Sequence, residues 1–189
     1  NPQARKGWAV TGKYEERQWN EPGNFKHLID DNSGTFWESD WNGPNAKDVP
    51  PILVIDTRKL HAFTKIGIMH RQNDSEKDKH NYKIEFYVSS SAKTWWNFDH
   101  EEYWNGKTGG EVNWQEMGWK DSTDWETQEN WIKVSDEITM QSLHNPEVEY
   151  YKLDGTKAGR YFIIKVVDRG MRNLAEFAEI YLYGEEVSE

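Results

Sequence analysis

Short runs of alternating apolar and polar residues recur along this chain. The clearest is YKIEFYVSS, in which Tyr82, Ile84, Phe86 and Val88 share one side of an extended strand. Helical periodicity is scarce, and 24–30 could form a single turn. We therefore predict an all-β protein, an antiparallel jelly-roll-like β-sandwich (galactose-binding-domain-like), and not a fold of βαβ units. The other β-branched runs bounded by turn-forming residues are 52–58, 63–71, 160–168 and 178–184.

A long acidic segment, 92–147, interrupts this strand pattern. A structureless connection of that length is unusual inside a compact domain, so we expect a Trp-rich insertion with short strands and aromatic packing of its own. Adjacent strand residues face opposite ways, so one of Trp95 and Trp96 is either an exposed platform or covered by the insertion. We expect 1–189 to be a single domain excised from a larger protein. The Trp residues of the insertion are Trp95, Trp96, Trp104, Trp114, Trp119, Trp125 and Trp131.

Composition excludes several classes of function. A net charge of −10 argues against a nucleic-acid partner or an anionic membrane surface. No apolar run is long enough for direct membrane insertion, and without Cys there is no disulfide or thiolate site. The chain has no H-E-x-x-H, no G-x-S-x-G and no Gly-rich phosphate loop, so we predict a protein that is not an enzyme.

The stretch IDDNSGTFWESD, residues 29–40, has the chemistry of a cation site. Asp30, Asn32 and Thr35 place carboxylate, amide and hydroxyl oxygens in one loop, and Ca²⁺ prefers such hard oxygen ligands. The EF-hand pattern is absent. The same residues are typical of a plain Asx-turn, so spacing alone leaves both interpretations open. Trp37 closes the stretch, and we expect it in the core.

The order of these features resembles the discoidin or F5/8 type C family, which overlaps with galactose-binding-like carbohydrate-binding modules. The resemblance runs from about residue 24 to 184. The features that carry it, in chain order, are T-x-W after the Asp-containing turn, the strand ending in Asp56, the strand YKIEFYVSS, the strand that begins RYF, and the final AEIYLYG. It implies a jelly-roll-like sandwich and a structural Ca²⁺. Asp30-Asp31 departs from the family's usual Asp-Gly. The implied ligands are the His27 carbonyl, the Asp30 carboxylate, the Asn32 oxygen, the Thr35 carbonyl and hydroxyl, the Ala178 carbonyl and the Glu179 carboxylate.

The resemblance also implies that a ligand binds the loops at one end of the sandwich. A sugar site needs an aromatic face together with a few fixed donors and acceptors. Arg71 and Asn73 are the best polar candidates, because a guanidinium and an amide can each bridge neighbouring hydroxyls. The alternative for Arg71 is an ordinary ion pair with one of the 33 acidic residues. The candidate ligand-binding residues are Trp41, His70, Arg71, Asn73, Trp95, Trp96 and Arg172.

These observations predict a non-catalytic carbohydrate-binding module, stabilised by Ca²⁺, that recognises an oligosaccharide or polysaccharide. We expect it outside the cell or at a bacterial cell surface, in a parent such as an outer-membrane-anchored lipoprotein for polysaccharide utilization. The alternative is a protein–protein interaction or assembly module of a multi-domain surface protein.

Overall fold

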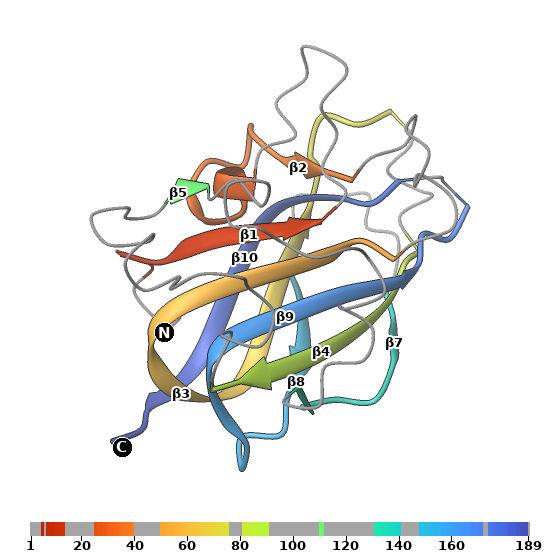
Figure 1. Cartoon of the computed structure of the whole chain (residues 1–189). Coiled ribbons are helices and arrows are strands. Elements are labelled where there is room, and N and C mark those ends of the chain that lie inside the picture. The colour runs from red at the N-terminus through yellow and green to blue at the C-terminus, as the bar shows by residue number, and fades with distance from the viewer. Residues whose placement is uncertain are drawn as a thin grey trace.

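Apart from one short helix, the regular secondary structure of the described residues is all β-strand (Figure 1). The structure, a computed structural model, describes residues 5, 7–13, 25–39, 50–75, 81–90, 110–111, 131–140, 148–171 and 174–188. Within these ranges one 3₁₀ helix, η1, covers Phe25–Ile29. No helix in this part of the chain is long and apolar enough to cross a membrane. The strands are β1 (Ala9–Lys13), β2 (Trp37–Glu38), β3 (Ile52–His70), β4 (Lys83–Ser89), β5 (Gly110–Glu111), β6 (Ile132–Lys133), β7 (Ile138–Thr139), β8 (Val148–Lys152), β9 (Ala158–Asp168) and β10 (Glu176–Glu186).

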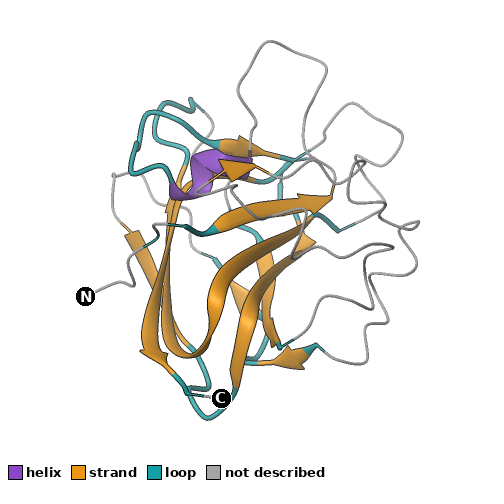
Figure 2. Ribbon diagram, turned by 60° about the vertical axis from the view of Figure 1, so that its left-hand side comes forward, coloured by secondary structure: helices purple, strands orange, loops and turns teal. Residues whose placement is uncertain are grey.

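One curled sheet joins the described strands in the main order β2-β10-β3-β9-β4-β6. Strand β3 belongs to both halves of the curl. Its residues 52–56 pair with β1 and β9, whereas 61–70 pair with β10 and, over part of their length, with β8. The pairings are antiparallel apart from β1 with β5. The strands curve over so that the two halves face each other across the core (Figure 2), which confirms the predicted all-β antiparallel fold.

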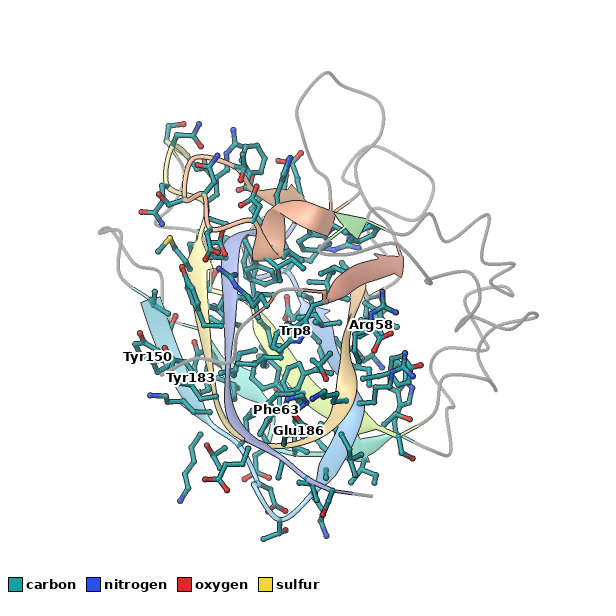
Figure 3. All side chains as sticks on the ribbon, turned by 90° about the vertical axis from the view of Figure 1, so that its left-hand side faces the viewer. Trp8, Arg58, Phe63, Tyr150, Tyr183 and Glu186 are labelled. Atoms are coloured by element: carbon teal, nitrogen blue, oxygen red, sulfur yellow. The ribbon has the colours of Figure 1, made fainter. Side chains whose placement is uncertain are left out.

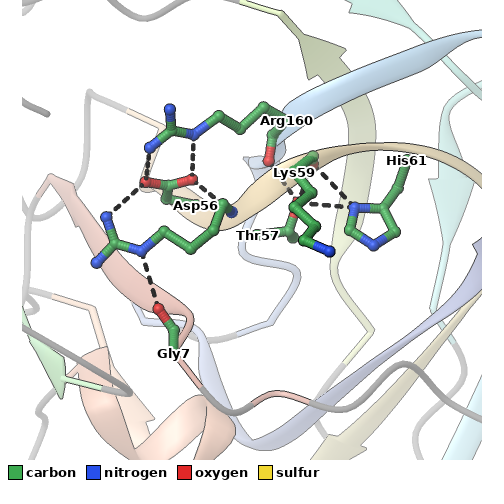
Figure 4. A network of polar contacts seen from close by, with 7 residues as sticks. Gly7, Asp56, Thr57, Lys59, His61 and Arg160 are labelled. Carbon is green, nitrogen blue, oxygen red and sulfur yellow. Dashed lines mark hydrogen bonds and ion pairs between the residues drawn. The ribbon is translucent and has the colours of Figure 1, made fainter. Parts of the chain in front are cut away.

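The runs predicted as two strands, 52–58 and 63–71, form one bent strand. The bend carries a register shift between Asp56 and His61, and Arg58 adopts a positive φ of 67°. The Asp56 carboxylate is fully buried and accepts two hydrogen bonds of 2.8 Å from Arg160 and one of 3.1 Å from the Arg58 guanidinium (Figure 4). A buried carboxylate therefore holds the corner where β3 passes from one half of the sheet to the other.

The core is aromatic, as the composition predicts for a chain with few but large apolar residues. Trp37 is 0% exposed and stacks between Phe25, at a centroid distance of 6.3 Å, and Phe177, at 5.7 Å. This confirms its predicted place in the core. On β4, Ile84 and Phe86 are fully buried and alternate with partly exposed residues, as the sequence pattern requires.

The structure describes only parts of the segment 92–147. Its C-terminal end extends the main sheet, because β6 and β7 both pair with β4. Trp131 packs on Tyr87 of β4 with 5.4 Å between ring centroids. At this position the segment therefore contacts the sheet itself. Trp95, Trp96, Trp104, Trp114, Trp119 and Trp125 lie outside the described residues, so their packing stays a prediction.

Candidate functional site

The loop after η1 meets the last strand through a shared hydrogen-bond donor. The backbone N–H of Asn32 donates to Asp30 Oδ1 at 3.0 Å and to Glu179 Oε1 at 2.8 Å. Thr35 closes the loop, since its hydroxyl donates to Asp30 Oδ2 at 2.7 Å and lies 2.9 Å from the Asn32 carbonyl. Oxygens from the two ends of the chain are thus gathered at one place on the molecule.

Asp31 takes the position where the resembling family has Gly. Its φ is 60°, in the left-handed region that Gly favours and Asp tolerates. The departure from Asp-Gly therefore leaves the turn geometry in place. Two hydrogen bonds inside the loop support the turn, from Gly34 N to Asn32 Oδ1 at 3.0 Å and from Thr35 N to the Asn32 carbonyl at 3.1 Å.

Sequence reasoning did not identify Arg5 as a neighbour of this loop. Its guanidinium forms ion pairs with Glu179 Oε2 and with Asp31, and donates to the Ile180 carbonyl at 3.1 Å. The Arg5 and Glu179 side chains are 7% and 0% exposed. Because 174 positions separate the two residues, no local pattern could have linked them. Glu179 therefore divides its oxygens, with Oε1 toward the loop and Oε2 toward Arg5.

The electrostatics of this site favour an added cation. Burial raises the pKa of Glu179 to about 7, although Arg5 acts in the opposite direction. With Glu179 ionised, the carboxylates of Asp30, Asp31 and Glu179 together with Arg5 carry two net negative charges. In the described part of the chain, no three His, Cys, Asp or Glu side chains form a metal cluster by themselves. Amide, hydroxyl and carbonyl oxygens would have to complete the shell, as is usual for Ca²⁺.

The other implied ligands lie on the flanks of the loop. His27 is buried, and its Nδ1 lies 2.9 Å from the Phe36 carbonyl, so the ring braces the loop from inside. Ala178 is fully buried beside Glu179 on β10. The donor set is chemically suited to Ca²⁺, because every proposed ligand atom is an oxygen.

A second polar group surrounds Arg71, directly after β3. Glu38 and Glu176 are buried and directly opposed across β2 and β10. The Arg71 Nη1 lies 3.3 Å from Glu38 and 2.7 Å from Glu176. Its guanidinium also lies 3.7 Å from the Phe36 ring centroid, and its Nε donates to Asn73 Oδ1 at 3.2 Å. Opposed like charges repel, so Arg71 is needed where these strands meet.

The remaining predicted ligand-binding residues differ from one another in their exposure to solvent. Asn73 is exposed beside Arg71, as a ligand contact requires. His70 is only 2% exposed and packs against Tyr82 and Phe177, so its role as a ligand contact stays a prediction. Glu38, Glu176 and Phe36 were not anticipated, because strand pairing brings them to Arg71. Trp41, Trp95, Trp96 and Arg172 lie outside the described residues.

The two groups are adjacent along both segments that build them. The loop oxygens end at Thr35, and Phe36 and Glu38 of the Arg71 group follow at once. On β10, Glu176 lies three residues before Glu179. The two groups are therefore built on the same two segments of the chain.

Comparison with solved structures identifies this architecture. The C-terminal domain of a Bacteroides fragilis chitobiase matches with a TM-score of 0.67 at 18% identity, over 100% of both chains. A family 32 carbohydrate-binding module of Clostridium perfringens NanJ, solved with galactose, matches with a TM-score of 0.59 at 19% identity, over 93% of both. Another Clostridium perfringens module, solved with GalNAc-β-1,3-galactose, gives 0.62 at 15% identity, over 94% of this chain and 95% of that one.

Sequence comparison adds a short match and no family assignment. No model of a known protein family matches the chain. A sialidase of Micromonospora viridifaciens is 29% identical over 75 residues, which are 40% of this chain and 11% of that protein. The chain has the jelly-roll fold of family 32 carbohydrate-binding modules, and the resemblance to F5/8 type C and galactose-binding-like domains is confirmed at the level of the fold.

Proposed function

We propose that this chain is a non-catalytic carbohydrate-binding module whose ligand site lies at Arg71 and Asn73. The observation that carries the proposal is the fixed geometry of Arg71, which lies on the Phe36 ring and is held by two buried carboxylates. A side chain ordered before binding loses little entropy when it meets a ligand. Guanidinium, amide and carboxylate groups side by side offer both donors and acceptors to vicinal sugar hydroxyls.

Aromatic stacking would come from Trp41, Trp95 and Trp96, which we propose to line the same end of the sandwich together with Arg172. The similar modules solved with galactose and with GalNAc-β-1,3-galactose make these two sugars the first ligands to test. The chitobiase and sialidase similarities favour a place in a larger carbohydrate-active protein outside the cell or at a bacterial surface.

We further propose that the loop carries a structural Ca²⁺. Asp30, Asn32 and Thr35 would bind it from the loop and Glu179 from β10, with carbonyls of His27 and Ala178. The carboxylates of Asp30, Asp31 and Glu179 outnumber the single cationic group of Arg5, and this charge supports a divalent ion. The bound ion would supply charge neutralisation and join the loop to the last strand. It would have no catalytic role.

A glycan array probed with the Ca²⁺-loaded chain tests the function. Asn73→Ala is the informative variant, because Asn73 is exposed and its loss leaves the buried carboxylates paired with Arg71. Lys83→Ala is the matched control, since Lys83 is half exposed on β4 and pairs at 3.9 Å with Glu137. We expect array signals that Asn73→Ala loses and Lys83→Ala keeps. An array without signal, with retained capture of a protein partner, would favour the interaction module instead.

A further inference from the structure

A hollow beside Tyr183 lies on the same outer face of β3 as Arg71. Residues 65, 67 and 69 share that face and Arg71 follows directly after the strand, whereas Ile66 and Ile68 point into the core. The hollow has a volume of about 420 Å³ and is bounded by Thr64, Lys65, Tyr183 and Glu185, with Gly155 and Gly184 beneath. This size falls within the range of about 300–1,000 Å³ that small-molecule sites occupy.

The backbone forms the hollow through a β-bulge. Tyr183 pairs with Lys65 and Gly184 pairs with Phe63, so Thr64 is the extra residue on β3. A side chain at position 184 would place its Cβ only 2.2 Å from the Ala62 carbonyl oxygen, so this close approach requires glycine. Bulges reorient neighbouring side chains and are frequent beside functional sites.

Tyr183 is the aromatic residue that lines the hollow, and Tyr150 packs against it from outside the lining. Tyr150 and Tyr183 lie side by side on the outside of the sheet (Figure 3), with ring centroids 6.0 Å apart. Tyr150 is 52% exposed. Lys65 Nζ lies 4.1 Å from the Tyr183 centroid and 4.8 Å from that of Tyr150, so cation–π contacts fix the ammonium at the rim. Burial and the Tyr150 hydroxyl raise the pKa of Tyr183 to about 12.

Chemistry distinguishes this hollow from a larger one of about 610 Å³ under β6 and β7. The apolar lining of the larger hollow is aliphatic, from Val134, Ile138 and Leu153. A pyranose ring needs a flat aromatic face for its C–H bonds and paired donors and acceptors for its hydroxyls. The smaller hollow has an aromatic wall, the ammonium of Lys65 and the carboxylate of Glu185 together.

We infer that the hollow is a second sugar site, which binds a pyranose residue against Tyr183 with its hydroxyls between Lys65 and Glu185. The inference rests on the proposed glycan-binding function and adds a site to it. Six residues of extended strand separate Lys65 from Arg71, so the two sites lie roughly 20 Å apart along one face. One polysaccharide chain that reached both would bind with an increased effective affinity.

The test is an NMR titration of the ¹⁵N-labelled full chain with galactose and, separately, with GalNAc-β-1,3-galactose. We expect the amides of 62–65 and 183–185 to shift, with a dissociation constant independent of that followed at 71–74. Tyr183→Phe, which keeps the ring, should preserve binding at the hollow. Tyr183→Ala should weaken it at least about tenfold. Glu185→Ala should also weaken binding at the hollow. Because Glu185 is exposed, this loss would not result from a folding defect of the kind that Tyr183→Ala could cause.

The outcomes separate this inference from the proposed function. Shifts at 71–74 without shifts at 62–65 and 183–185 would overturn the second site and leave the proposed function standing. Shifts at the hollow alone would support the second site and overturn the site at Arg71. If neither sugar shifts either group of amides, both proposals are overturned.

Discussion

Removal of calcium is predicted to make the stability of the protein fall with rising pH, through the titration of Glu179. Burial raises the pKa of this carboxyl from 4.5 to about 7, a difference of about 2.5 units. At about 1.36 kcal/mol per pKa unit, ionising the group in the folded, metal-free protein costs roughly 3 kcal/mol. A carboxyl with a raised pKa binds its proton more tightly when the chain is folded. The chelated protein is therefore most stable below the unfolded pKa of 4.5 and loses stability as the pH rises through about 7.

Bound Ca²⁺ is expected to cancel this loss, because it favours the ionised carboxylate and binds only the folded chain. Its stabilisation is about 2.7 kcal/mol when the free ion is at one hundred times its dissociation constant. The calcium-loaded protein should then keep its stability where the chelated protein weakens.

Urea unfolding between pH 5 and pH 8, in EDTA and in saturating Ca²⁺, measures the effect. Glu179→Gln is the matched control, because it keeps the shape of the side chain and removes its titration, while the other acids titrate as before. In EDTA the wild-type unfolding free energy should fall by roughly 2–3 kcal/mol relative to the variant across this range, because part of the loss already occurs below pH 5. An equal pH dependence of the two proteins in EDTA, or an unfolding midpoint indifferent to Ca²⁺, would refute the reasoning.

Three further substitutions test how the fold is held. Arg71→Ala removes the guanidinium that lies between two opposed buried carboxylates, and chemical denaturation should show a loss of about 3–5 kcal/mol; a loss below about 1 kcal/mol would contradict the assigned geometry. Asp56→Asn breaks the buried ion pairs at the corner of β3 and should cost about 3–5 kcal/mol, whereas Lys59→Met removes an exposed pair and should cost under about 1 kcal/mol. Equal losses in these two would show that burial is not the deciding factor. Trp37→Ala should cost about 3–5 kcal/mol by calorimetry, and a small loss would mean that the cavity collapses.

The features that could be predicted from the sequence are those with a local signature. The alternation in β4 follows from the two-residue period of a strand with one buried face, and Ile84 and Phe86 obey it. Trp37 could be placed in the core because a turn ends just before it. The loop could be recognised by its oxygen-bearing side chains, although its spacing also suited an Asx-turn.

What could not be predicted depends on pairing between distant segments. The polar positions at the corner of residues 52–70 predict two separate strands, because nothing local shows that Asp56 is neutralised by Arg160. The sheet topology likewise brings Arg5 to Glu179 and places Glu38 opposite Glu176 of β10. In a chain with 33 acidic residues, composition does not indicate which of them are buried together.

Calorimetric titration of the chain with the strongest glycan from the array tests the central claim most directly, when it is performed in Ca²⁺ and again after chelation. A saturable isotherm in Ca²⁺ that is weakened at least about tenfold by EDTA is the predicted result, because the loop leads directly into Phe36 and Glu38. An isotherm that EDTA leaves unchanged would contradict the coupling of the ion to the sugar site. The absence of saturable heat in Ca²⁺ would contradict glycan binding itself.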